Sequence, residues 1–194
     1  MDLKEAGLCE GISEVIATTQ SASGVPNAAP IGILTREGNF FVKLYQDSQT
    51  ISNVQVKKEL AANVTDDAVL FVNAAFATLS ENYFSLFHSF PVLKEANSWI
   101  IFNCNVIEER REFFLFQLTP IAVEINRQVM RAINRGLNAV IEAAILATRY
   151  GIIEDEREKA EMKEMIERYV AIVEKCGGRR EKDAMSVLYD IMLL

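Results

Sequence analysis

The chain has 194 residues, of which 50% are hydrophobic and 24% are charged, and its formal net charge is −7. This composition supplies enough apolar side chains for one sizeable domain, or a domain with a smaller appendage, and excludes a disordered chain. Binding to nucleic acids or to anionic membranes requires a concentrated basic face, which an acidic chain lacks, so we expect neither as a partner. No secretion signal or run of roughly 20 apolar residues is present, so we expect a cytoplasmic protein.

The cysteine and histidine content argues against metal and disulfide chemistry. Cys9, Cys104 and Cys176 are far apart and form no CxxC pair, so we expect buried free thiols rather than a disulfide framework or a zinc site. The single histidine, His88, cannot form a histidine-rich metal site, and we identify no serine or cysteine nucleophile that would pair with it. We therefore predict no metal and name no catalytic residue.

The first two thirds of the chain are predicted to form an antiparallel barrel. Short β-branched and aromatic runs are separated by turn residues, and the connections at Gly24 and Gly38 are typical of hairpins. Consecutive hairpins imply antiparallel pairing, and strands that mix alternation with continuous apolar runs are typical of a closed barrel. The predicted strands are residues 12–19, 27–34, 39–45, 69–73, 98–108 and 113–125.

A short helix is predicted between two of these strands, over residues 49–62, with Asp47 or Ser48 as its N-cap. Residues 74–97 are aromatic-rich, and their sequence leaves open whether they form a second helix or a large loop.

From about residue 126 the apolar residues follow helical spacing. Three helices are predicted, ending at Gly151, at Gly177 and near Met192, and their methionines are expected in the core because methionine fills gaps between packed elements. The sequence therefore predicts an α+β protein: an antiparallel split barrel over residues 1–125, followed by a C-terminal three-helix bundle over residues 126–194 that packs on the barrel.

The residues that open the first predicted helix form a candidate anion site. Ser48, Thr50 and Asn53 lie where unpaired backbone N–H groups and the positive end of the helix dipole favour a phosphate. Lys43, near the end of the preceding strand, would add a positive charge. The alternative is that Asp47 or Ser48 only caps the helix, since such caps are common.

A second candidate surface follows the first turn. The segment Asn27–Pro30 offers a flat stretch of backbone that a planar ring can approach, and the Asn27 amide can bond the ring's polar atoms. Thr18 and Thr19, at the end of the paired strand, are expected to face the same region. There is an alternative for each group. The small residues of the Asn27–Pro30 segment can serve only packing, and Thr18 and Thr19 can be ordinary strand residues.

The order of these elements resembles a known fold. The segments NAAPIG, KLYQDSQT and VTDDAVLFV are similar, in this order, to the FMN-binding split barrel of flavin reductases and pyridoxamine-phosphate-oxidase-like proteins. More narrowly, NAAPIG, Thr50 with Asn53, TDD at residues 65–67 and the segment at residues 134–149 resemble a mostly archaeal family catalogued only as a domain of unknown function. The resemblance covers nearly the whole chain.

This resemblance implies an FMN-binding flavoprotein, a flavin reductase-like oxidoreductase with FMN near the interface of a homodimer. It places the flavin phosphate near Lys43, Ser48, Thr50 and Asn53. It places the isoalloxazine ring along Thr18, Thr19, Asn27, Ala28, Ala29, Pro30 and Gly32. Two alternatives remain: a flavin-binding module without turnover, and a binder of another phosphorylated heterocycle such as the deazaflavin F420 or a pterin.

The chain departs from the resemblance in one respect. The helix-start segment lacks the arginine that many split-barrel proteins use against the phosphate, so Lys43 or a distant arginine must substitute. The candidate arginines are Arg127, Arg131, Arg135 and Arg149. The alternative is that these side chains are solvated or form salt bridges.

Overall fold

The computed structural model describes residues 3–129 and 132–192, and the chain divides into two compact units. The first unit comprises residues 1–65 and 78–129, and the second comprises residues 66–77 and 130–194. The main boundary lies close to the predicted one at residue 126. Residues 66–77, which the prediction placed in the barrel, instead belong to the helical unit.

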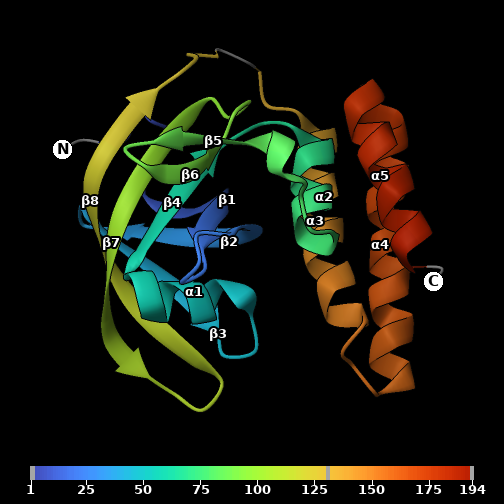
Figure 1. Cartoon of the computed structure of the whole chain (residues 1–194). Coiled ribbons are helices and arrows are strands. Elements are labelled where there is room, and N and C mark those ends of the chain that lie inside the picture. Colours follow the sequence, from blue (N-terminus) through green and yellow to red (C-terminus); the bar gives the residue numbers. More distant parts are fainter. Residues whose placement is uncertain (1–2, 130–131, 193–194) are drawn as a thin grey trace. The chain divides into compact units, whose positions relative to one another are not determined.

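The first unit is a closed antiparallel barrel of six strands in the order β1-β2-β3-β8-β7-β4 (Figure 1). The predicted α+β class and antiparallel barrel are confirmed, and five of the six predicted strands coincide with observed ones to within two residues. The barrel strands are β1 (Gly11–Gln20), β2 (Pro26–Arg36), β3 (Asn39–Tyr45), β4 (Glu59–Val64), β7 (Ser98–Glu109) and β8 (Phe113–Ile125).

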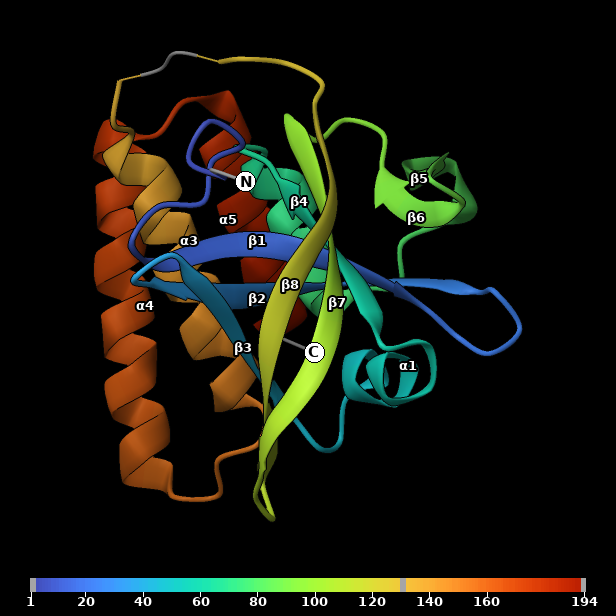
Figure 2. The ribbon, with the colours of Figure 1, turned by 90° about the vertical axis from the view of Figure 1, so that its left-hand side faces the viewer.

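Residues 74–97, whose form the sequence left open, contain the end of a helix, a 3-10 turn (Glu81–Tyr83) and a hairpin. The hairpin strands β5 (Phe84–Phe87) and β6 (Phe90–Leu93) form a separate two-stranded sheet (Figure 2). Buried Phe90 and Val92 of this hairpin pack with Ala61 and Ile101 of the barrel strands. Neighbouring residues Ala62 and Ile100 belong to the barrel core, so strand alternation puts the hairpin on the outer face of the barrel.

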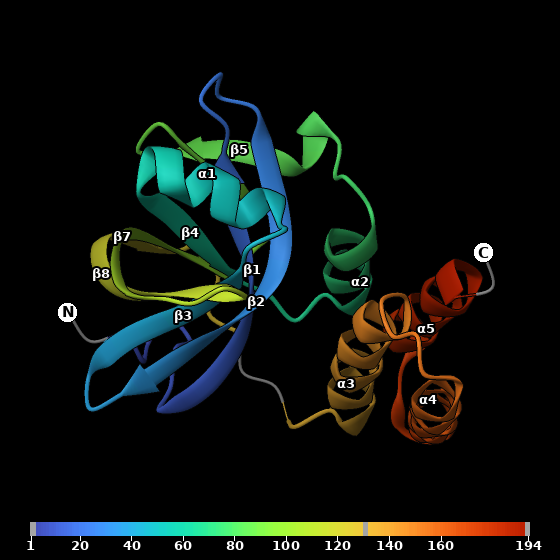
Figure 3. The same cartoon turned by 90° about the horizontal axis from the view of Figure 1, so that it is seen from below.

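The barrel core is built from the inward faces of the strands and from helix α1 (Gln49–Lys57). Phe102 and Phe116 are its largest fully buried side chains. Ile51 and Val54 of α1 belong to the same cluster, so the core holds this short helix in place. Figure 3 shows α1 beside the barrel strands. Full burial of a side chain of this size stabilises a fold by roughly 1.5–3 kcal/mol.

The predicted helix over residues 49–62 ends earlier than expected. Lys58 adopts a left-handed conformation with φ of 58°, and its N–H donates to the carbonyl of Val54, which terminates α1. The next residues form β4, which pairs with both β1 and β7 and closes the barrel. The sequence of β4, ELAANV, has little β-propensity of its own, so its two neighbouring strands decide its conformation.

The predicted strand over residues 69–73 is wrong, because these residues lie in helix α2 (Ala68–Phe76). Asp67 caps this helix, and its Oδ1 accepts the N–H groups of Val69 and Leu70 at 3.0 and 3.1 Å. A helix that is buried on most of its surface is apolar nearly all round, so its sequence resembles that of a buried strand.

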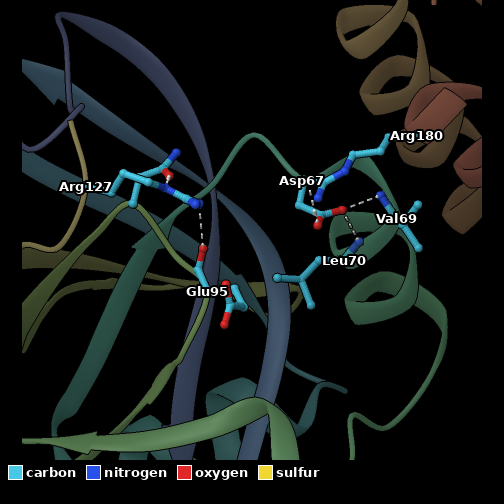
Figure 4. A network of polar contacts seen from close by, with 7 residues as sticks. Asp67, Val69, Leu70, Glu95, Arg127 and Arg180 are labelled. Carbon is cyan, nitrogen blue, oxygen red and sulfur yellow. Dashed lines mark hydrogen bonds and ion pairs between the residues drawn. The ribbon is translucent and has the colours of Figure 1, made fainter. Parts of the chain in front are cut away.

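The second unit contains α2, α3 (Arg135–Tyr150), α4 (Glu156–Cys176) and α5 (Arg179–Met192), which confirms the three predicted C-terminal helices. The second carboxylate oxygen of Asp67 pairs with Arg180 at 3.4 Å and links the start of α2 to α5 (Figure 4). The expected methionine core is only partly confirmed, because Met185 is buried whereas Met165 is 44% exposed.

The buried amide of Asn63 attaches the hairpin to the barrel. Its Nδ2 donates to the carbonyl of Ile16 at 2.8 Å and to the hydroxyl of Thr18 at 3.1 Å. Its Oδ1 accepts the N–H of Leu93 at 2.7 Å. Thr18 in turn donates to the carbonyl of Pro91 at 2.6 Å. One side chain of β4 therefore satisfies polar groups of β1 and β6 together.

We expect Asn63→Ala to lower the free energy of unfolding by about 2–4 kcal/mol, because it leaves buried polar groups of two strands unpaired. Thr35→Val is the matched control, since the buried Thr35 hydroxyl has no hydrogen-bond partner within the described residues and its removal should cost nothing. Urea unfolding of both variants measures the difference. Equal stability of the two variants would contradict this role of Asn63.

Gly136 of α3 and Gly177, which follows α4, approach each other closely. A Cβ atom added to Gly136 would lie 2.5 Å from the Cα of Gly177, so Gly136→Ala should destabilise the helical unit by about 1–3 kcal/mol. Gly151→Ala is the control, because nothing lies within 4 Å of its added Cβ and its backbone is right-handed. Thermal unfolding should show a lower melting temperature for the first variant only.

Candidate functional site

A cluster of polar side chains joins β1, β2 and the start of α1. The Asn27 amide donates to Thr50 Oγ1 at 3.4 Å, and Asn53 Nδ2 donates to Thr19 Oγ1 at 3.0 Å. Gln49 completes the group by donating to Asn53 Oδ1 at 2.9 Å. Because Thr19, Thr50 and Asn53 are buried, these hydrogen bonds hold the side chains in fixed orientations.

The register of the first two strands and the helix geometry assemble this cluster. Thr19 lies directly opposite Asn27 in the β1–β2 pair, so both side chains point to the same face. In α1, Gln49 and Asn53 are four residues apart and Thr50 and Asn53 three, which places them on neighbouring positions of one helix surface. The structure thus brings together residues from both of the predicted candidate surfaces.

The start of α1 presents donors for an anion. Ser48 caps the helix, accepting the N–H of Ile51 at 3.3 Å and donating its own hydroxyl to the carbonyl of Tyr45 at 3.0 Å. Within the described residues, the N–H groups of Gln49 and Thr50 form no hydrogen bond. The first turn carries no acidic side chain, so nothing in it opposes the positive end of the helix dipole. Capping by Ser48 and an anion site are therefore compatible.

Lys43 lies outside this hydrogen-bonded cluster. Its side chain is exposed, and its Nζ lies 4.0 Å from the ring centroid of Phe113 and 5.1 Å from that of Tyr45. Cation–π attraction holds the ammonium group on this aromatic surface. Its contact with a phosphate remains a prediction.

The sequence suggested that Thr18 and Thr19 face the same region. In the structure they face different regions. The Thr19 hydroxyl meets Asn53 of α1, whereas the Thr18 hydroxyl meets Asn63 and Pro91. Successive side chains of a strand point to opposite faces, so only Thr19 joins the polar cluster. The hydroxyl of Thr18 is used to hold the hairpin.

The stretch of β2 from Pro26 to Gly32 has an open edge. All its residues pair with β1, but β3 pairs only with residues 33–36 of β2. Every residue of the stretch is half-buried. By alternation, Asn27 and Ala29 share the face of Thr19, while Ala28, Pro30 and Gly32 occupy the other. Backbone groups on this edge can hydrogen-bond a flat ligand.

Arg127, the candidate arginine of the barrel unit, bonds residues outside the cluster. Arg127 donates to the side chain of Asn97 at 3.1 Å and to the carbonyl of Glu95 at 3.4 Å (Figure 4). Arg135 and Arg149 are exposed on α3. Arg131 lies outside the described residues. Within the described part of the barrel unit, the side chains that bond one another around Thr50 are uncharged amides and hydroxyls.

The described cysteines and metal-ligating side chains form neither a disulfide nor a metal centre. Burial, with a smaller effect of Glu59, raises the pKa of the Cys104 thiol to about 12, so it is protonated and unreactive at neutral pH. Cys9 is exposed and Cys176 is half-buried. Residues 3–129 and 132–192 contain no group of three or more histidine, cysteine or acidic side chains placed to hold a metal ion. None of the described helices has the length and apolarity to span a membrane.

Two family models match the chain in succession. The model of the N-terminal domain of DUF447, a protein of unknown function, matches residues 13–127, and a second DUF447 model matches residues 134–190. The chain belongs to the DUF447 family. The resemblance drawn from the sequence motifs to an archaeal family of unknown function is thereby confirmed.

DUF447 relatives are found in archaea. An uncharacterized protein of Methanocaldococcus jannaschii is 25% identical over 189 residues, which cover 91% of this chain and 96% of that protein. The crystal structure of an FMN-bound DUF447 protein from Methanosarcina mazei is 39% identical, with a TM-score of 0.90 over 98% of this chain and 100% of that one.

More distant structures share the barrel. A flavin reductase domain protein from Arthrobacter sp. FB24 matches with a TM-score of 0.54 and 12% identity, covering 61% of this chain and 80% of that one. The flavin reductase of a styrene monooxygenase from Pseudomonas putida S12 matches with a TM-score of 0.52 and 10% identity, covering 66% of this chain and 89% of that one. At these identities the likeness shows the fold of the barrel.

Proposed function

We propose that this DUF447 chain is a flavoprotein that binds FMN. The observation that carries the proposal is the similarity over the full length to the FMN-bound protein from Methanosarcina mazei. The residues of this chain fit such a ligand, because they offer both a donor-rich helix start and an open strand edge on one barrel. The first suits a phosphate, and the second suits a planar ring.

The start of α1 would hold the FMN phosphate. The Thr50 oxygen already accepts a hydrogen bond from Asn27, so the Thr50 hydroxyl proton is available for a ligand. The free N–H groups of Gln49 and Thr50 add two further donors, and the helix dipole adds partial positive charge. In this arrangement Asn27 orients the Thr50 hydroxyl rather than bonding the ring. Asn53 likewise orients the Gln49 side chain by accepting its hydrogen bond.

The isoalloxazine ring would lie along the open edge of β2, between Asn27 and Gly32. Small side chains there allow the ring to approach the backbone, whose N–H and C=O groups would fix its orientation. When bound, the flavin supplies hydride or electron transfer. The chain's own residues would bind it, orient it and exclude water.

The proposal extends to an oxidoreductase that works as a homodimer, in the manner of flavin reductases. The open edge of β2 leaves one side of the ring uncovered by its own barrel, and a second copy would cover it. Ile12 and Leu34, opposite each other in the β1–β2 pair, are 70% and 39% exposed. Exposed apolar side chains on the β1–β2 pair, beyond its open edge, support an interface with another subunit.

The visible spectrum of the purified chain tests flavin binding and turnover. We expect flavin absorption bands and release of FMN on denaturation, because the cofactor is held without a covalent bond. Anaerobic addition of NADH or NADPH should bleach the bands if the chain is an oxidoreductase, whereas persistent colour would favour a binding module without turnover. A colourless chain that fails to bind added FMN would refute the flavin proposal and leave F420 or a pterin to be tested in the same way.

The phosphate placement is tested by Thr50→Val, alone and combined with Lys43→Met. Removing the hydroxyl should weaken FMN binding by about 1–3 kcal/mol, because a hydrogen bond to a charged group is lost while the side-chain volume is kept. Thr119→Val on the exposed face of β8 is the matched control and should bind as the parent does. Quenching of flavin fluorescence measures the affinity. An unchanged dissociation constant in the double variant would refute the placement.

A further inference from the structure

A cleft of about 320 Å³ lies beside the β5–β6 hairpin, separate from the polar cluster at α1. Its lining comes from the hairpin and from β4, β7 and β8, and combines apolar side chains with two polar ones, Glu59 and His88. The lining residues that matter here are Phe90, Ile101, Ile121, Val123, Glu59 and His88. This volume is at the lower end of the roughly 300–1,000 Å³ found for small-molecule sites, so it suits a ligand of one or two rings.

The wall formed by the hairpin is firmly anchored. Asn63 and Thr18 bond its backbone at Leu93 and Pro91, as described above. In addition, the indole N–H of Trp99 donates to the carbonyl of Leu93 at 2.8 Å. Three side chains of the barrel thus fix the backbone of β6, so the cleft is a preformed feature of the barrel surface.

The hairpin turn places His88 at the rim in a strained conformation. His88 and Ser89 have φ of 47° and 63°, in a two-residue turn where asparagine and glycine are the favoured residues. Such backbone strain persists only when the surroundings hold it, and it is frequent at ligand sites. The Phe87 ring supports the imidazole edge-on, with centroids 4.6 Å apart, and itself lies 5.7 Å from the Trp99 ring.

The polar rim defines what the cleft can bind. The His88 side chain is exposed and lines the cleft, so its ring nitrogens can reach a ligand. Glu59 contributes a carboxylate, which accepts hydrogen bonds and repels anions. The apolar walls favour an aromatic ring over a strongly hydrated molecule. A phosphate group such as that of FMN is therefore unsuited to this rim.

We propose that this cleft binds a small uncharged aromatic molecule that carries an O–H or N–H donor, of the phenol or aniline class. The ring lies against Phe90, Ile101 and Ile121, and the donor points to the Glu59 and His88 rim. The site is additional to the proposed flavin site and does not depend on it, because its residues lie on β4, β7, β8 and the hairpin rather than on α1 and β2.

The single histidine provides a direct test in the full-length chain as purified. Its imidazole gives one histidine Hε1 signal in the proton NMR spectrum, and phenol is the probe. We expect a saturable shift of this signal as phenol is added at fixed pH. A signal that does not move with phenol, or that moves linearly without saturation, would overturn the proposal.

Ile121→Glu should weaken phenol binding at least about tenfold, because it fills the cleft and puts a second carboxylate in it. Ile121 is 49% exposed, so the change is compatible with folding. Ile125→Glu, four residues further along β8 and 37% exposed, does not line the cleft and should bind phenol as the parent does. Equal phenol affinity in the two variants would contradict the site.

FMN binding by the same variants separates this site from the flavin site. We expect Ile121→Glu to keep its affinity for FMN and Thr50→Val to keep its affinity for phenol. Competition between phenol and FMN, or a loss of FMN binding in Ile121→Glu, would show that the cleft belongs to the flavin site and would overturn the proposal of an additional one. Failure of the chain to bind FMN would leave the phenol test intact.

Discussion

The antiparallel register of β1 and β2 places Thr19 directly opposite Asn27, and the candidate site is built on this pair. From these two strand positions, hydrogen bonds reach Asn53 and Thr50 of α1. A shift of one residue in the pairing would turn the side chains of the shifted strand to the other face of the sheet, so that Thr19 and Asn27 would no longer face the helix together. The donors at the helix start therefore depend on strand pairing as much as on the helix itself.

Because successive side chains alternate between its two faces, β1 forms side-chain hydrogen bonds with α1 on one face and with β4 and the hairpin on the other. Thr19 faces α1, while the adjacent Thr18 holds the hairpin together with Asn63. Barrel strands with both faces occupied have a continuous buried run, which β1 shows from Val15 to Thr19. The same short stretch of chain thus supports the proposed phosphate site on one face and the wall of the phenol-class cleft on the other.

An acidic chain can hold an anionic group because short-range donors outweigh its net charge. The formal charge of −7 is spread over the surface and is screened by salt over about 10 Å, whereas N–H and O–H groups at a helix start act in direct contact. Uncharged donors in a partly buried site are weakly screened. This explains how a phosphate can bind at a helix start that has no arginine in its own segment. Lys43, which lies nearby in sequence on an aromatic surface, can add a positive charge.

The sequence by itself determined the antiparallel barrel, the three C-terminal helices, the α1 start and the family, because these depend on local turn residues, periodicity and motif order. Tertiary structure decided β4, which takes its conformation from its two neighbouring strands. It likewise decided α2, whose apolar sequence resembles that of a buried strand and is buried as a helix. It also decided which face each site residue occupies. Thr18, Thr19 and Asn27 are equally plausible ligand contacts in the sequence, but hydrogen bonds to residues more than 20 positions away assign them different roles, and no local pattern contains that information.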